Sequence, residues 1–422
     1  MPDYKKKRKH YSPIRRKNRF VEDEDFPIKR GSKDKNGEVF ERAITPPRLV
    51  KGKKQKRIAG FKVITVTFAV IAIIIFVLKL IFPVGIIEMA GHFFKTLGVG
   101  NYPVELAGNE IIDTVVEGDH YYVLTNTDVY LLTNNGKVIS SFSHHLTDPV
   151  VKSSATRTLI FSQGKNDYDV YVNGEKKYSG TAESGLICGD VSDSGVYAVA
   201  SYSKSYASTV SVYSSKGTSL YKWNCANDYI NSVALSNNGK KIAVSTFNTS
   251  GGKAYSKIYI FDFKSSDSEK TITIEGETVY ELVSCDKGFY ITAGKSATFV
   301  DWKNKSQSVI KNEYDLKRFV TDSRLSAALF SRADNENDNR VSLIDNNGKN
   351  IKNISVSGKI RDISVKGKCV YVLGENSVTL YNEKGEKTGQ IKCSDVCRRV
   401  VALDPSKFCL VTDNTISCEK IR

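Results

Sequence analysis

One hairpin pattern recurs along most of this chain and constrains its fold more than any other feature. In "VYLLTNNGKVISSF" (Val129–Phe142), two apolar runs flank an Asn-Asn-Gly-Lys turn, and related segments surround Gly174, Gly217, Gly348 and Gly385. The runs alternate β-branched or aromatic residues with polar ones, which is the period of a β-strand. Gly and Asn supply the positive φ of a tight turn. The pattern therefore predicts repeated antiparallel hairpins.

Two further strands precede each hairpin, so the repeating unit has four antiparallel strands, which we name a, b, c and d. "INSVALSNNGKKIAVST" (Ile230–Thr246) contains an a strand, a short turn and a b strand. The a strands begin 37 to 49 residues apart, near Ile111, Pro149, Leu186, Ile230, Val279, Leu316, Ile360 and Cys397. A four-stranded unit at this spacing is typical of a β-propeller, whose blades cover one another only when the ring closes.

The two ends of the repeat predict how the ring closes. The last unit, which starts at Cys397, stops after its third strand, and the segment "NYPVEL" (Asn101–Leu106) precedes the first unit as an unassigned strand. We expect this segment to supply the missing d strand. The predicted fold is all-β, an eight-bladed β-propeller over residues 101–422. Seven blades would follow if one unit is miscounted, and two separate β domains are the rival arrangement.

A long apolar run precedes the repeat. A helix from Val63 to Phe82 would be about 30 Å long, which is the thickness of a bilayer core. A buried core helix seldom runs this long without a polar face, and no Ala-x-Ala cleavage site of a signal peptide follows. We predict a transmembrane helix at residues 61–84 and a juxtamembrane linker at residues 85–100.

The basic character of the chain belongs to its N-terminal tail. Residues 1–62 hold 21 of the 62 Lys and Arg residues but only 8 of the 46 Asp and Glu residues. Residues 1–60 have few apolar positions and no strand or helix period, which predicts disorder. "KGKKQKR" (Lys51–Arg57) beside the span predicts a cytoplasmic tail and an extracytoplasmic propeller in the cell membrane. We expect the tail to contact anionic lipid headgroups, with docking of a cytoplasmic partner or nucleic acid as the alternative. We expect no specific nucleic-acid binding.

A resemblance to known propellers rests on one segment and on the overall layout. "VALSNNGKKIAVST" (Val233–Thr246) resembles the first half of a WD40 or quinoprotein-type blade, although the Trp-Asp and Gly-His signature of WD40 repeats is missing. The order of basic tail, single span and propeller is similar to an uncharacterised family of membrane-anchored propeller proteins of Gram-positive bacteria. This resemblance implies an architecture and brings no activity with it.

The b–c connections supply the candidate binding residues. They are long in three units, "YSKSYAST", "FNTSGGKAYSK" and "RADNENDNR", and all would emerge on one face. Long loops on one face of a rigid scaffold commonly carry function, although insertions without a ligand are the alternative. The predicted partner-binding rim consists of Tyr202, Tyr206, Lys253, Tyr255, Arg332 and Asp334.

The cysteines suggest one disulfide. Cys409 and Cys418 fall on neighbouring strands of the last unit, and an extracytoplasmic site permits a bond between them; buried thiols are the alternative. No zinc-ligand spacing, phosphate loop, dinucleotide fingerprint or catalytic triad occurs, so we predict no cofactor.

These features predict a non-enzymatic binding or scaffolding protein of the cell envelope that presents its propeller to a protein or a glycan. The alternative is a propeller hydrolase or lyase that acts on envelope glycans. That alternative requires Asp, Glu, Arg and Tyr side chains that converge at the mouth of the central channel.

Overall fold

The computed structural model describes residues 66–74, 76–77, 95, 98–106, 108–118, 120–154 and 156–421. Residues 66–74 and 76–77 are helical. Within the described residues, no helix combines the length and the apolar run needed to cross a bilayer. Val63, Phe82 and the predicted tail lie outside the described residues, so the span and the tail stay predictions. The chain divides into two compact units, residues 1–67 and 68–422, and the 32 strands of the described residues belong to the second.

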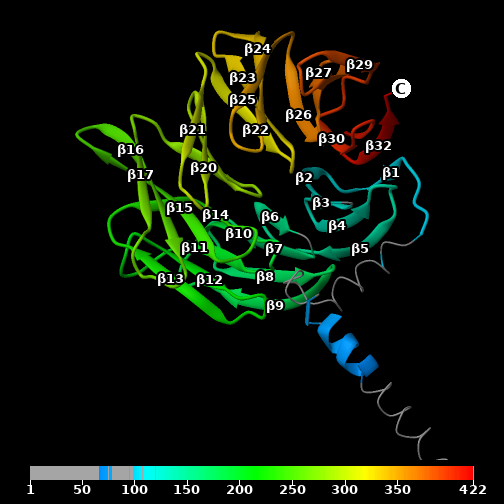
Figure 1. Cartoon of the computed structure of the whole chain (residues 1–422). Coiled ribbons are helices and arrows are strands. Elements are labelled where there is room, and N and C mark those ends of the chain that lie inside the picture. Colours follow the sequence, from blue (N-terminus) through cyan, green and yellow to red (C-terminus); the bar gives the residue numbers. More distant parts are fainter. Residues whose placement is uncertain are drawn as a thin grey trace, which may run out of the picture. The chain divides into compact units, whose positions relative to one another are not determined.

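Eight four-stranded antiparallel sheets form the blades of a β-propeller (Figure 1). Each blade takes its strands in the order a to d. The strands are, in blade 1, β2 (Ile111–Glu117), β3 (His120–Thr125), β4 (Asp128–Thr133) and β5 (Val138–Ser143); in blade 2, β6 (Pro149–Ser154), β7 (Arg157–Ser162), β8 (Asp167–Val172) and β9 (Glu175–Thr181); in blade 3, β10 (Leu186–Val191), β11 (Tyr197–Tyr202), β12 (Ser208–Tyr213) and β13 (Ser219–Cys225); and in blade 4, β14 (Tyr229–Leu235), β15 (Lys241–Ser250), β16 (Lys253–Asp262) and β17 (Lys270–Glu275). They are, in blade 5, β18 (Val279–Ser284), β19 (Gly288–Ala293), β20 (Ser296–Asp301) and β21 (Gln307–Lys311); in blade 6, β22 (Asp315–Thr321), β23 (Leu325–Arg332), β24 (Asn335–Asp345) and β25 (Asn350–Ser357); in blade 7, β26 (Ile360–Lys366), β27 (Cys369–Gly374), β28 (Ser377–Asn382) and β29 (Lys387–Lys392); and in blade 8, β30 (Arg399–Asp404), β31 (Lys407–Val411), β32 (Thr415–Lys420) and β1 (Val104–Glu105). This arrangement confirms the eight-bladed fold.

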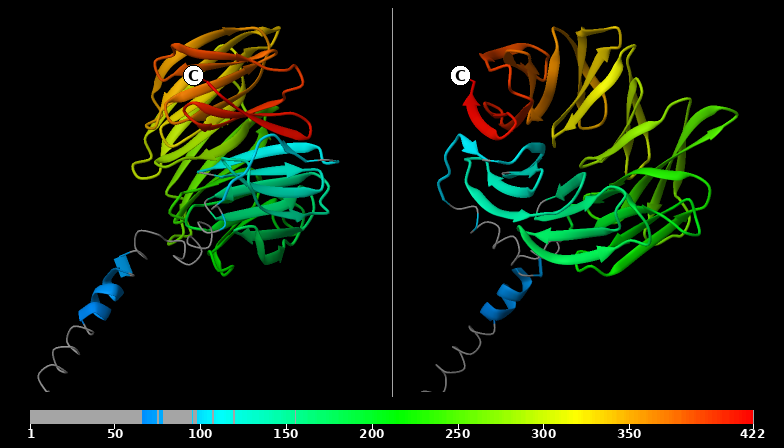
Figure 2. Two further views of the ribbon diagram at one scale, coloured as in Figure 1. Left: turned by 90° about the vertical axis from the view of Figure 1, so that its right-hand side faces the viewer. Right: turned by 180° about the vertical axis from the view of Figure 1, so that it is seen from behind.

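Blade 8 takes its d strand from the other end of the repeat, as Figure 2 shows. Val104 pairs with Ile416 and Glu105 pairs with Thr415. The backbone N–H of Leu106 then donates to the carbonyl oxygen of Asn414 at 2.8 Å. The predicted closing role of Asn101–Leu106 is therefore confirmed, although only two residues of this segment form a regular strand.

Hydrophobic packing holds the ring together between the blades. Among the described residues, eight clusters of buried apolar side chains occur, one at each junction between neighbouring blades. At the junction that closes the ring, Val401 and Cys409 of blade 8 pack with Tyr121 and Leu132 of blade 1. Burial of apolar surface stabilises this junction in the same way as the other seven.

The strand order gives the propeller two distinct faces. The b–c connections and the starts of the a strands lie on one face, here called the b–c face, and the c–d turns lie on the opposite, c–d face. The described part of the segment before the propeller contacts the c–d face. Lys95 Nζ lies 2.9 Å from Glu175 Oε1 beside the c–d turn of blade 2. Asn135 Nδ2, in the c–d turn of blade 1, donates to Gly98 O at 3.0 Å.

A β-bulge marks the start of the a strand in six blades, where one residue is left out of the a–b pairing. The skipped residues include Tyr280 in blade 5 and Arg361 in blade 7. A bulge adds an unpaired residue and redirects its side chain. Tyr280 is accordingly 58% exposed on the b–c face.

The register of blade 8 places Cys409 on β31 directly opposite Cys418 on β32, and a disulfide joins them. The other six cysteines are free thiols, of which Cys225 and Cys397 are buried. Burial raises the pKa of both thiols, so they stay protonated and pack as small apolar side chains.

Candidate functional site

Two of the three long b–c connections are strand extensions rather than loops. In blade 4, β15 and β16 are each 10 residues long. They meet at a turn through Gly251 and Gly252, whose φ angles are 59° and 78°. In blade 6, β23 continues to Arg332 and β24 resumes at Asn335. The prediction of loops was wrong for these two blades, because the polar segments continue the hydrogen-bonded ladder. In blade 4, the glycine pair permits the tight turn.

Three exposed aromatic rings form a row on the b–c face of blades 3 and 4, which we call the aromatic row. It consists of Tyr202 at the end of β11, Tyr229 at the start of β14 and Phe247 on β15. The ring centroids lie 6.5 Å apart for Tyr202 and Tyr229, and 6.1 Å apart for Tyr229 and Phe247. The three residues are 46%, 45% and 38% exposed. Tyr206, in the loop at residues 203–207 of blade 3, is also exposed.

A nearly buried carboxylate fixes the strand extension that carries Phe247. Asp228 Oδ1 accepts hydrogen bonds from Asn248 Nδ2 at 2.8 Å and from Tyr255 Oη at 3.1 Å. Lys257 Nζ lies 3.6 Å from Asp228 Oδ2 and 5.0 Å from the centroid of the Tyr255 ring. Desolvation and the bond to Asp228 raise the pKa of Tyr255, so its phenol stays a donor. These contacts hold the base of the hairpin in one position.

The two predicted rim residues of blade 6 form an ion pair with each other. Arg332 Nε lies 2.7 Å from Asp334 Oδ1, and Arg332 Nη2 donates to Asp334 Oδ2 at 3.1 Å. Asp338 also accepts a hydrogen bond from Tyr314 Oη at 2.7 Å. In the described part of the chain, no contact joins this hairpin to the aromatic row. The six rim residues thus divide into two separate places on the b–c face.

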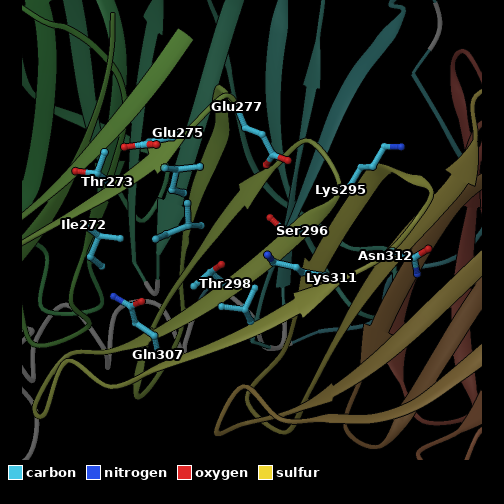
Figure 3. Close-up of a pocket in the computed structure, with 13 residues that line it drawn as sticks. Ile272, Thr273, Glu275, Glu277, Lys295, Ser296, Thr298, Gln307, Lys311 and Asn312 are labelled. Carbon is cyan, nitrogen blue, oxygen red and sulfur yellow. The ribbon is translucent and has the colours of Figure 1, made fainter. Parts of the chain in front are cut away.

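A groove runs between blades 4 and 5 beside the extended hairpin (Figure 3). Its volume is about 390 Å³, and its walls come from β17 on one side and from β20 and β21 on the other. Glu275 and Glu277 stand at the blade 4 side, and Lys295 and Lys311 belong to blade 5. The b–c turn of blade 5 is short, at Gly294 and Lys295, whereas the neighbouring hairpin is long.

Sequence reasoning identified Tyr202 and Tyr206 but missed Tyr229, Phe247 and Asp228. The available signal was an aromatic residue just outside each buried run, in "NDYIN" and "TFNTS". Lys253 lies opposite Ser250 at the tip of the blade 4 hairpin, away from the Asp228 contacts at its base. Among the described residues, no group of three or more His, Cys, Asp or Glu side chains is placed to hold a metal ion.

Comparison with known proteins identifies one family and the fold. The sequence profile described as "Family of unknown function (DUF5711)" matches residues 107–421. No curated protein matches the sequence. The chain is similar to the crystal structure of the C-terminal WD40 domain of Sif2, with a TM-score of 0.54 and 10% identity over 77% of this chain and 100% of that domain. It also matches BamB from Moraxella catarrhalis, with a TM-score of 0.49 and 10% identity over 76% of this chain and 99% of that one. The likeness to the WD40 domain confirms the propeller architecture.

Proposed function

Because this chain belongs to the family of unknown function DUF5711, we propose its function from the propeller itself: a binding module that holds a protein partner on the b–c face of blades 3 to 5. The observation that carries the proposal is the aromatic row, three adjacent rings left exposed on a rigid scaffold. Tyrosine is enriched among the residues that dominate binding energy at protein interfaces. The propeller fold itself fits a scaffolding or binding role.

The same proposal includes an anchor in the cell membrane. The predicted helix at residues 61–84 would span the membrane, with the basic tail against anionic lipid on the cytoplasmic side. The contacts of Lys95 and Gly98 support a particular orientation, because both lie on the c–d face. An anchor that arrives at that face leaves the b–c face directed away from the membrane, toward a partner in the envelope.

The enzyme alternative requires acid and base groups at the mouth of the channel. There the structure brings together Arg318, Arg361 and Asp362, which is part of the required set. Among the described residues that line the hollow at this place, Asp362 is the only carboxylate, and both of its oxygens have partners. Oδ2 accepts the backbone N–H of Val400 at 3.1 Å, and Oδ1 lies 3.3 Å from Arg318 Nε. Because glycoside hydrolysis commonly uses a pair of carboxylates across the bond, we favour the binding module.

Site-specific photo-crosslinking in cells tests the binding module. With benzoylphenylalanine in place of Tyr206, the full-length chain is expected to form one discrete protein adduct. The combined variant Tyr229→Ala and Phe247→Ala should reduce that adduct at least about tenfold, because truncation of an interface hot spot commonly costs about 2 kcal/mol or more. The measurement is adduct yield on immunoblots, with identification by mass spectrometry.

Leu220 supplies the matched control position, because it is 45% exposed like Tyr206 but lies on the outer strand β13. The probe at position 220 should give no such adduct. Equal adducts at both positions, or a yield that does not depend on the aromatic row, would show that this face is not the interface. A glycan ligand would leave no protein adduct and would also refute the proposal.

A further inference from the structure

A second hollow lies on the b–c face on the opposite half of the ring from the aromatic row. Its volume is about 330 Å³. Its walls come from the a strands of blades 6, 7, 8 and 1 and from the end of β31, and the lining residues are Ile111, Ile112, Arg318, Arg361, Asp362, Arg398, Arg399, Val411 and Thr412. Four of these nine residues are arginines.

These arginines lie near the starts of the a strands of three successive blades. In blade 7, Arg361 is the residue that the a-strand bulge leaves out of the pairing, whereas in blade 6 that residue is Lys317 and Arg318 follows it as the partner of Leu329. Arg398 and Arg399 stand at the start of β30 in blade 8, where the backbone N–H of Arg398 donates to Val411 O at 2.8 Å. The bulges of blades 3, 4 and 5 skip Ile187, Asn231 and Tyr280 instead. The guanidinium groups therefore gather on one side of the channel mouth.

Backbone carbonyls and carboxylates hold the guanidinium groups in place. Arg361 Nη1 donates to Cys397 O at 2.9 Å and also contacts Asp395 O. Arg399 pairs with Asp113, and its Nη2 donates to Ile112 O at 2.9 Å.

The remaining two arginines also pair with carboxylates, Arg318 with Asp362 inside the hollow and Arg398 with acidic residues at its edge. Arg318 pairs with Asp362, while Arg398 Nε lies 2.5 Å from Asp413 Oδ1 and Arg398 Nη1 lies 3.5 Å from Glu110 Oε1. Each guanidinium carries five N–H donors, so each keeps donors beyond these contacts.

The charge balance singles out Arg361. The other three arginines each have a carboxylate partner, whereas the two oxygens that accept from Arg361 belong to neutral peptide groups. Its positive charge is therefore less compensated than that of its neighbours. Arg318 and Arg398 are 44% and 58% exposed, so both remain accessible from solvent. Arg361, held by carbonyls and flanked by accessible arginines, has the features of an anion site.

We propose that this hollow binds an oxyanion, a carboxylate or phosphate group that presents at least two oxygens to the arginines around Arg361. Planar guanidinium groups match such groups with paired hydrogen bonds, which a point charge such as lysine does not. The site lies in blades 6, 7, 8 and 1 and does not depend on the partner proposed for blades 3 to 5.

Titration calorimetry on the full-length chain in detergent tests the site, with citrate as the carboxylate probe and pyrophosphate as the phosphate probe, at fixed ionic strength near 0.15 M. The test variant is Arg361→Gln, which removes the charge without leaving a carboxylate unpaired. The matched control is Arg332→Gln, which removes one arginine from the same face outside the hollow.

We expect at least one probe to bind and Arg361→Gln to weaken it tenfold or more, while Arg332→Gln changes the affinity less than twofold. Binding of citrate alone would assign a carboxylate ligand, and binding of pyrophosphate alone a phosphate ligand. Absence of binding by either probe would overturn the proposal, as would an equal loss in the two variants. A circular dichroism melt of Arg361→Gln verifies that a loss does not come from unfolding.

Discussion

Replacement of residues 101–106 by a glycine-serine segment of the same length is expected to open the ring at blade 8. The change removes β1 and the side chain of Leu106, which is only 5% exposed in the cluster that joins blades 8 and 1. Loss of one buried leucine commonly costs about 2–5 kcal/mol, and the paired backbone of β1 is lost as well. We therefore expect the free energy of unfolding to fall by at least about 3 kcal/mol.

Denaturant unfolding followed by tryptophan fluorescence measures this loss, because Trp302 is buried in the cluster between blades 4 and 5. The freed edge of β32 should also promote association, which size-exclusion chromatography detects. The control replaces residues 264–268, in the c–d turn of blade 4, with the same kind of segment. If the unfolding midpoint moves no further in the β1 variant than in this control, β1 does not close the ring.

Gly348→Ala is expected to lower the free energy of unfolding more than the same change at Gly276, which has a similar φ but open surroundings. Gly348 has a φ of +78°, and a Cβ on it would lie 2.3 Å from Phe299 Cβ and 2.4 Å from Phe299 Cγ. Phe299 is 3% exposed in the cluster between blades 5 and 6, so it has little room to move. Left-handed backbone strain of about 1–2 kcal/mol and overpacking of about 1–3 kcal/mol should together cost about 2–5 kcal/mol.

Gly276→Ala separates these two contributions. Gly276 has nearly the same φ, +77°, and nothing lies within 4 Å of a Cβ placed there. This variant should show the backbone strain alone, about 1–2 kcal/mol. Chemical denaturation of both variants gives the comparison. Equal losses in the free energy of unfolding would mean that Phe299 yields at no cost and that the packing argument fails.

The turn glycines show where sequence reasoning was sufficient and where it was not. In the sequence, Gly136, Gly174 and Gly348 indicate tight c–d turns, and all three have the positive φ that such turns require. These glycines also leave room for a neighbouring segment, and only the packed structure shows this. A Cβ on Gly136 would meet Asn101 O at 2.8 Å, and a Cβ on Gly174 would meet Ser140 Oγ at 1.9 Å in the preceding blade. The pattern of a turn is local, whereas the contact depends on how the next blade is placed.

The b–c connections show the opposite case, in which a local interpretation was wrong. "FNTSGGKAYSK" looks like a loop because its residues are polar, yet it forms the ends of β15 and β16. A segment can form a strand without apolar side chains when its backbone N–H and C=O groups have a hydrogen-bonding partner strand. The two halves of this segment pair with each other in this way. An alternation of polar and apolar residues does not reveal that pairing when both faces of a hairpin are exposed to solvent.

The sequence by itself determined the architecture of this protein. Alternation with a period of two, glycine turns and a spacing of about forty residues specify blades, and a missing strand at one end with a spare strand at the other specifies closure. These are properties of neighbouring residues and of counting, so they can be read along the chain. The tertiary structure confirmed both the number of blades and the closing segment.

Only the tertiary structure decided where the candidate sites are. The aromatic row joins Tyr202 to Phe247 through Tyr229, and the second hollow joins Ile112 to Arg399 across the closure of the ring. Such residues are far apart in sequence and meet because blades pack in a circle and bulges redirect single side chains to the channel mouth. No periodicity in the sequence shows which side chains a closed ring brings together. The sites could therefore be identified only from the tertiary structure, whereas the fold could be predicted without them.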